Sequence, residues 1–120
     1  MTTVFTETAH DGEFILSEAS GSRSRDNGEV ASGQDLAAGT VVQYDGGSRL
    51  IAYTGDEFTN GEEDEACGVL IPAVDSTDGH VKAAFIARDA EVNLNLLTYP
   101  AAKEAVMIQS LKRIGIICRS

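Results

Sequence analysis

The sequence predicts a mainly β (α+β) domain with one helix near the C-terminus. Dipeptides typical of tight turns recur at intervals of 15 to 18 residues, a spacing that suits short strands joined by turns. Apolar residues at helical spacing occur in one stretch, residues 100–113. With 120 residues, 42% of them hydrophobic, the chain has the size of one domain and can bury one core. The turn dipeptides are Asp11-Gly12, Asn27-Gly28, Asp45-Gly46, Asn60-Gly61 and Asp78-Gly79.

Two strand pairs are predicted in the middle of the chain. Residues 40–44 (TVVQY) and 49–53 (RLIAY) flank a glycine-containing turn whose glycines permit the positive φ angles that a hairpin requires. The next two strands are predicted at residues 67–74 and 80–88, joined across a turn. Pro72 cannot donate a ladder hydrogen bond, so the strand at 67–74 is expected to be an edge strand or to break at that point.

A helix is predicted over residues 100–113. Pro100 suits the first helical turn, and Gly115 supplies a residue that can end the helix in the left-handed conformation. Residues 116–118 (IIC) are then expected to form a short final strand. The apolar residues expected on one face of the helix are Ala101, Ala105, Ile108 and Leu111.

The first 39 residues differ from the rest, because thirteen of them are apolar and only Phe14-Ile15-Leu16 form a cluster. Such a segment buries too little apolar surface to offset the entropy lost on ordering. We expect residues 1–39 to be an extended N-terminal arm that orders on a partner, and residues 40–120 to be the β-rich core domain. The alternative is a floppy terminus without a function, for which the apolar cluster and Phe5 would not be needed.

The charge is distributed unevenly along the chain. Nineteen acidic and nine basic residues give a net charge of −10. Residues 1–65 carry fourteen acids and three bases, for −11, and residues 66–120 carry five acids and six bases, for +1. This balance argues against duplex nucleic acid as a partner, because phosphate binding needs clustered Lys and Arg. There is neither a long apolar run nor a signal-peptide pattern, so we expect synthesis in the cytoplasm and no contact with a membrane.

Metal sites find little support in the sequence. Residues 56–65 are strongly acidic, but Phe58 and Cys67 occupy ligand positions of the calcium-loop template, so a solvated loop is favoured over weak cation binding. Cys67 and Cys118 lie in apolar contexts and are expected to be small buried side chains. The two cysteines lie 51 residues apart and form no metal-binding pair, so no structural zinc site is expected.

Catalytic patterns are also missing from the sequence. Neither His10 nor His80 lies near a nucleophile motif, and no phosphate-binding glycine motif occurs. Asp89 and Glu91 could be an acid and a base, but they are more simply interpreted as surface charges. We therefore expect no enzyme activity, no catalytic residues, no cofactor and no bound metal.

Five segments, taken together in their order and spacing, resemble the lambda-type head decoration (capsid cement) proteins of tailed bacteriophages. The resemblance covers nearly the whole chain, and the acidic loop at residues 55–65 is more heavily charged than expected for the family. The segments are GEFILSEASGSRSRDN (12–27), VASGQDLAAGTVV (30–42), CGVLIPAVD (67–75), ARDAEVNLNLLTYP (87–100) and LKRIGIICR (111–119).

The resemblance implies a compact, β-clip-like mixed sheet and a structural role in the virion. The expected protein is a homotrimer on the outer capsid surface, made in the host cytoplasm. It binds the major capsid protein at threefold positions of the expanded head and stabilises the head against DNA pressure. Its N-terminal arm is expected to be disordered in the free protein and ordered on the capsid.

The predicted capsid contacts are the apolar residues of the arm, which can add a strand to a partner's sheet, and two arginines as charge anchors. A deletion of residues 2–20 is expected to leave a folded trimer that no longer decorates capsids. Two alternatives stay open: a trimeric β-clip enzyme that binds or hydrolyses nucleotides, and an acidic DNA-mimic inhibitor. The predicted contact residues are Val4, Phe5, Phe14, Ile15, Leu16, Arg23 and Arg25.

Overall fold

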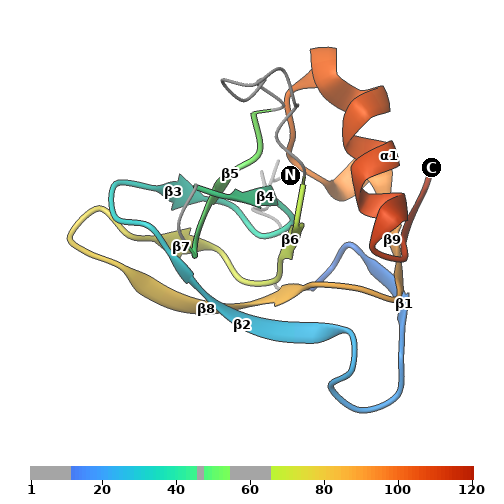
Figure 1. The fold of residues 1–120 in the computed structure, drawn as a ribbon, viewed down its shortest axis with the longest axis horizontal. Helices are drawn as coiled ribbons and strands as arrows, with labels where there is room; N and C mark the ends of the chain where they lie inside the picture. Colours follow the sequence, from blue (N-terminus) through green and yellow to red (C-terminus); the bar gives the residue numbers. More distant parts are fainter. Residues whose placement is uncertain (1–11, 46–47, 55–65) are drawn as a thin grey trace, which may run out of the picture.

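The computed structural model describes residues 12–45, 48–54 and 66–120, and within these ranges the chain is mainly β with one α-helix, as predicted (Figure 1). The strands are β1 (Ile15–Glu18), β2 (Arg25–Val30), β3 (Asp35–Leu36), β4 (Val41–Tyr44), β5 (Arg49–Ala52), β6 (Gly68–Leu70), β7 (Val74–Asp75), β8 (Val81–Ile86), β9 (Ala90–Asn93) and β10 (Ile116–Arg119). The helices are two 3-10 turns, η1 (Leu94–Leu96) and η2 (Ala101–Lys103), and α1 (Glu104–Arg113).

Five strands close into a barrel in the order β2-β5-β4-β6-β8. The longest pairing joins β2 and β8, which run antiparallel from Arg25 opposite Ile86 to Val30 opposite Val81. The predicted hairpin is confirmed, because β4 and β5 pair antiparallel and the Asp45 N–H donates to the Arg49 carbonyl at 3.0 Å. The barrel thus contains the first predicted strand pair and, through β6 and β8, part of the second.

A second sheet brings the two ends of the described chain together. Its order is β1-β9-β10, with β1 antiparallel and β10 parallel to the central strand β9. Helix α1 packs against β10, and both lie on the side of the molecule where β1 and β9 run (Figure 1). The predicted final strand is therefore confirmed, and its neighbour is β9.

The strand predicted at residues 67–74 is divided at Pro72. Its first part is β6, which belongs to the barrel, and its second part is β7, which pairs with β3 in a two-stranded sheet. Because the proline nitrogen carries no hydrogen, it cannot continue the ladder between these two parts. The short β3-β7 sheet lies on the left of Figure 1, on the side away from α1.

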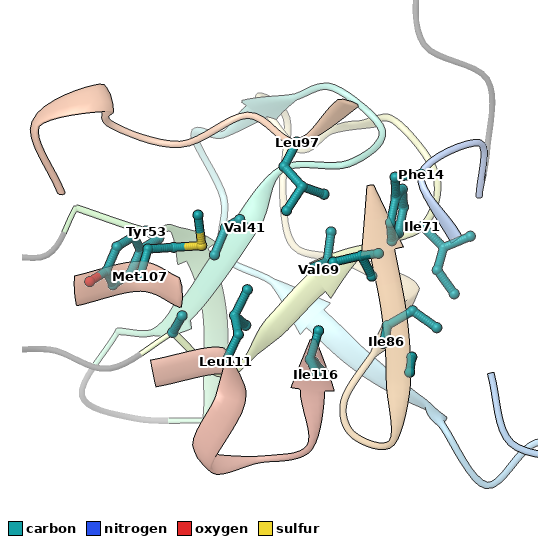
Figure 2. Close-up of a cluster of buried hydrophobic side chains, with 13 residues drawn as sticks. Phe14, Val41, Tyr53, Val69, Ile71, Ile86, Leu97, Met107, Leu111 and Ile116 are labelled. Atoms are coloured by element: carbon teal, nitrogen blue, oxygen red, sulfur yellow. The ribbon is translucent and has the colours of Figure 1, made fainter. Parts of the chain in front are cut away.

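The buried side chains form two clusters on opposite faces of the barrel strands. The first, called here the inner core, consists of Val30, Leu36, Val42, Leu50, Leu70, Val74, Ala83 and Phe85. The second, the outer core, is drawn in Figure 2 and consists of Phe14, Val41, Tyr53, Ala66, Val69, Ile71, Ile86, Ala90, Val92, Leu97, Met107, Leu111 and Ile116.

The predicted helix is confirmed, with a different buried face. It begins as the 3-10 turn η2, continues as α1 and ends before Gly115, which has a φ of 84°. Ala101 and Ala105 are exposed and Ile108 is half-buried, so only one residue of the predicted face, Leu111, is fully buried. A 3-10 turn has fewer residues per turn than an α-helix, so Ala101 does not continue the apolar face of α1, and within α1 the buried face is centred on Met107 and Leu111 rather than on Ala105. The buried residues of α1 are Met107, Ser110 and Leu111.

The structure corrects the boundary predicted at residue 39. Residues 12–39 contribute β1, β2 and β3 to the sheets, and Phe14 and Val30 are almost fully buried at 1% and 0% exposure. This part of the predicted arm therefore belongs to the folded domain, because its few apolar side chains fill places in both cores. Val4 and Phe5 lie outside the described residues, so the structure does not test their predicted roles.

One predicted turn, Asn27-Gly28, lies inside β2 instead. A Cβ atom on Gly28 would come within 2.7 Å of the Leu50 Cδ1 atom and 3.0 Å of the Phe85 Cε1 atom. The glycine is needed because it lets two side chains of the inner core pack directly against the β2 backbone. Here glycine indicates close packing rather than a turn.

Candidate interface around the N-terminal strand

The described chain begins at a well-anchored point beside the outer core. The Gly12 N–H donates to the Ile71 carbonyl at 3.2 Å, and the Asn93 N–H donates to the Phe14 carbonyl at 2.8 Å. Between these bonds the Phe14 side chain is buried next to Ile71 (Figure 2). Phe14 was predicted as a capsid contact, but the structure uses its ring to fix the start of β1, so in this fold it has no surface to offer a partner.

The strand β1 presents one exposed apolar side chain. The register with β9 shifts between Ile15 and Ser17, which leaves Leu16 as an extra residue without an opposite partner. Such a bulge redirects the side chain that it carries, and Leu16 is 52% exposed whereas Ile15 packs on the outer core. Of the predicted cluster Phe14-Ile15-Leu16, Leu16 is the residue most available to a partner.

The outer edge of β1 is also available. Among the strands of the described ranges, β1 pairs with β9 alone, so it is an edge strand of its sheet. The unpaired backbone groups of an edge strand can receive a strand from another chain. An exposed bulge and an open edge thus lie together at the point where residues 1–11 join the described chain.

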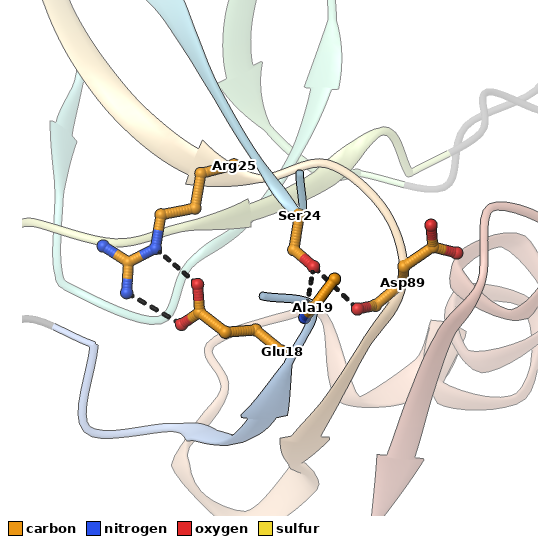
Figure 3. A network of polar contacts seen from close by, with 5 residues as sticks. All are labelled: Glu18, Ala19, Ser24, Arg25 and Asp89. Atoms are coloured by element: carbon orange, nitrogen blue, oxygen red, sulfur yellow. Dashed lines mark hydrogen bonds and ion pairs between the residues drawn. The ribbon is translucent and has the colours of Figure 1, made fainter. Parts of the chain in front are cut away.

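Of the two predicted charge anchors, one is already engaged within the domain. The Arg25 guanidinium donates two parallel hydrogen bonds to the Glu18 carboxylate, both 2.8 Å long (Figure 3). This hydrogen bonding lowers the pKa of Glu18 and raises that of Arg25. Arg23 has a 70% exposed side chain and only a loose approach to Asp89, at 3.8 Å, so it is the arginine better placed to meet an acidic surface.

Ser24, between these arginines, is a residue that the sequence analysis passed over. It is fully buried, with 0% exposure. Its Oγ accepts from the Ala19 N–H at 2.9 Å and donates to the Asp89 carbonyl at 2.7 Å (Figure 3). The sequence carries no strand signal for this residue, because Arg23 and Ser24 lie in the turn before β2 and the partners of the hydroxyl come from segments as distant as Asp89.

The exposed face of the second sheet carries a polar ladder rather than a catalytic pair. The Ser17 hydroxyl donates to Glu91 at 2.8 Å, and Arg119 donates to the same carboxylate at 2.7 Å, so the ladder crosses all three strands. These bonds lower the pKa of Glu91, first through Ser17 and then through Arg119. Glu91 is therefore held ionised and engaged on the surface, whereas Asp89 lies at the turn before β9.

The other candidate groups occupy structural positions. His80 accepts a hydrogen bond from the Ser32 N–H at 3.0 Å. Cys67 and Cys118 are free thiols, and burial raises the pKa of Cys67 to about 12, which keeps it protonated and unreactive. Within the described ranges no three His, Cys, Asp or Glu side chains gather as a metal site would require. The acidic stretch 56–65 and His10 lie outside those ranges.

Comparison with known proteins decides the family. A family model described as bacteriophage lambda head decoration protein D matches residues 4–116. The chain belongs to this family. No curated protein matches the chain. The resemblance seen in the sequence is thus confirmed, and the chain is a head decoration protein, a structural component of the phage capsid.

The match to the head decoration family covers the elements that build the candidate interface. It includes β1, the whole barrel, β9 and α1, and it ends at the first residue of β10. Head decoration is a structural role, which agrees with the absence of a catalytic motif in the sequence. No helix in the described part of this decoration protein has the length and apolar character needed to span a bilayer.

Proposed function

We propose that this head decoration protein binds the expanded phage head as a homotrimer, at the local threefold positions of the major capsid protein lattice, on the outer surface. A protein that binds the expanded shell but not its precursor stabilises the expanded state by the difference in binding free energy. The shell thereby resists the pressure of packaged DNA. The family match carries this proposal, and no catalytic step is required.

The shell contact is proposed to form around β1. Residues preceding Gly12, including Val4 and Phe5, add as a strand to a sheet edge of the capsid protein, and Leu16 packs against it. The support is that these residues lead directly into β1, where the Leu16 side chain is exposed and can extend the same contact. In strand addition the backbone hydrogen bonds supply affinity, and alternate side chains supply selectivity.

The net charge of the trimer and its three arms both affect the proposed binding to the shell. Three chains carry a formal charge of three times −10, or −30, which repels nucleic acid and leaves few cations to meet an acidic shell surface. Arg23, with its exposed guanidinium, is the proposed charge anchor among those few. Once the first arm of a trimer is seated, the other two bind at high effective concentration, so modest single contacts give long residence.

Truncation tests the proposed contact. The deletion of residues 2–20 considered from the sequence would remove Phe14 and β1 and so damage the outer core. A deletion of residues 2–11 leaves every described residue in place. We expect it to keep the thermal unfolding midpoint and to abolish co-sedimentation with purified expanded shells. Normal decoration by this variant would contradict the proposal.

A point substitution with a matched control sharpens that test. Leu16→Asp places a charge on the bulge of β1, and Tyr44→Asp places one at the end of β4, where the side chain is similarly exposed at 47% against 52% for Leu16. We expect Leu16→Asp alone to weaken shell binding. Equal losses in the two variants would argue against a contact specific to β1.

The oligomeric state is tested separately. Sedimentation equilibrium of the full chain is expected to give about 38 kDa, three times the 12.7 kDa of one chain. Co-sedimentation with expanded shells but not with procapsids is the expected selectivity. A stable monomer at all concentrations would contradict the trimer. Equal binding to expanded shells and procapsids would contradict the stabilisation mechanism.

A further inference from the structure

The hydroxyl of Ser24 joins three segments that meet beside β1. It accepts from the Ala19 N–H directly after β1, and it donates to the Asp89 carbonyl in the turn between β8 and β9. The backbone of Ser24 itself leads into β2, and its carbonyl accepts from the Ala87 N–H at 2.8 Å. A single buried serine therefore connects the end of β1 to the barrel and to the start of β9.

The acceptor of this hydroxyl is held in an uncommon conformation. Asp89 has a φ of 50°, the left-handed region that residues with a side chain rarely adopt. From its other side Gly115 approaches so closely that a Cβ atom there would lie 2.7 Å from the Asp89 Oδ1 atom. Asp89 thus lies close to both Ser24 and Gly115, so the Ser24 hydroxyl is attached to a closely packed turn.

The remaining contacts of the β1–β2 connection lie on the surface. The Arg25–Glu18 pair joins the start of β2 to the end of β1 on the surface. Arg88 donates to the Arg23 carbonyl at 2.7 Å. These arginines are partly exposed, so water competes for the same groups. The two hydrogen bonds of the Ser24 hydroxyl are shielded, so losing them would leave Ala19 N–H and Asp89 C=O without this partner.

We infer that Ser24 is a positioning residue for shell binding: its buried hydroxyl locks the end of β1 to the β8–β9 turn, so that the edge of β1 is preformed before the shell arrives. This inference rests on the proposed function, because it concerns the same surface. If the shell binds only molecules in which β1 is docked, the apparent affinity equals the intrinsic affinity multiplied by the docked fraction.

Ser76 provides a matched control within the same domain. It is also 0% exposed, its Oγ accepts from the Gln34 N–H at 3.1 Å and it donates to the Ala31 carbonyl at 2.6 Å. It thus makes the same kind of bridge as Ser24, but beside the β3-β7 sheet rather than beside β1. Replacing either serine by alanine removes one buried hydroxyl and frees one backbone amide.

The experiment compares Ser24→Ala and Ser76→Ala in the full-length protein with the unmodified chain. Hydrogen exchange is measured at the amides of Ala19, Gln34 and β1, and binding to purified expanded shells is measured by co-sedimentation. We expect Ser24→Ala to accelerate exchange at Ala19 and in β1 and to weaken shell binding about tenfold, as docking of β1 in one molecule of ten would give. Ser76→Ala is expected to accelerate exchange at Gln34 and to bind shells as the unmodified chain does.

The outcomes separate the inference from the proposed function. If the unmodified chain does not bind expanded shells, the proposed function fails and the role of Ser24 in binding fails with it. If it binds, equal shell affinities for the two alanine variants overturn the inference alone, as does unchanged exchange in β1 of Ser24→Ala. Should Ser24→Ala not fold, Ser24→Cys keeps the shape of the side chain, with a somewhat larger atom, and weakens both bonds, and the same measurements decide.

Discussion

The inner and the outer core of this decoration protein differ in which parts of the sequence supply them. The inner core takes its residues from Val30 to Phe85, whereas the outer core extends from Phe14 to Ile116. Strands β4, β6 and β8 contribute to both through neighbouring residues, as Val41 and Val42 illustrate. One set of strands therefore supports two layers, since successive side chains of a strand point to opposite faces.

Because β1 contributes to the outer core, the candidate interface depends on the outer core more directly than on the inner core. The β1 edge is anchored in the outer core through Phe14 and in the β8–β9 turn through Ser24. The inner core closes the barrel without either residue. Damage to the outer core should therefore reach the candidate interface first, and damage to the inner core should unfold the whole domain.

The largest effect is expected from Phe14→Ala. Removing a buried phenylalanine ring costs about 3–5 kcal/mol of unfolding free energy, because apolar burial is lost and a cavity stays behind. Urea unfolding measures this loss, and hydrogen exchange shows where protection disappears. We expect the amides of β1, β9 and β10 to lose protection before those of β2 and β8.

Phe85→Ala is the control for that comparison, because Phe85 belongs to the inner core and is 2% exposed. Phe85→Ala should lower the free energy of unfolding by a similar amount. It should lower protection from hydrogen exchange equally in the barrel and in the β1-β9-β10 sheet. If Phe14→Ala also lowers protection evenly throughout, the two cores unfold as one cooperative unit.

An intermediate effect is expected from Gly115→Ala, at the end of α1. Gly115 has a φ of 84°, and a Cβ atom there would lie 3.1 Å from the Asp89 nitrogen as well as near its carboxylate. Strain and crowding together should cost about 1–3 kcal/mol. Gly21→Ala is the matched control, because Gly21 has a φ of 69° but no atom within 4 Å of such a Cβ.

Thermal unfolding of the two variants separates crowding from backbone strain. We expect Gly115→Ala to lower the midpoint more than Gly21→Ala does, and the excess to reflect contact with Asp89. Equal shifts of the unfolding midpoint would mean that Asp89 moves to make room for the added methyl group at little cost in free energy.

The smallest effect is expected from Glu18→Gln on the surface of β1. Its bonds to Arg25 lower the pKa of Glu18 below the ordinary value of 4.5, so the folded state favours the carboxylate. The pair is partly exposed, so it contributes about 0.5 kcal/mol at neutral pH. This contribution is present above the ordinary pKa and is lost as the pH falls through the lower pKa of the folded state.

Urea unfolding of both proteins at pH 7 and at pH 3 measures this contribution. The difference between the unmodified chain and Glu18→Gln should shrink on acidification. A difference that grows toward low pH would show that Glu18 is stabilised in its protonated form, against the bonding seen with Arg25.

Local signals in the sequence were sufficient for several elements. The hairpin of β4 and β5, the break at Pro72 and the end of α1 before Gly115 each follow from turn chemistry or from the geometry of one residue. These signals act over a few residues, so a single sequence contains all the information that they need.

The placement of residues 12–39 depended on partners far along the chain. Strand β2 (RDNGEV) is polar along most of its length and has no apolar alternation, yet it forms the longest pairing in the barrel, with β8. Likewise, the bulge that exposes Leu16 while Phe14 is buried arises from the register with β9. The sequence suggested Arg23 and Arg25 as charge anchors, but it could not show that Arg25 is paired with Glu18 within the domain.

The pairing of β1 with β9 also sets an order of assembly during synthesis. Ser17 and its partner Glu91 are separated by 74 residues, and β9 is flanked on its other side by β10, which follows it in the chain. The barrel strands, residues 25–86, can leave the ribosome and close while β1 still has no neighbour. The edge of β1 is therefore completed after the barrel, and a product that stops before β9 would lack the strand with which β1 pairs.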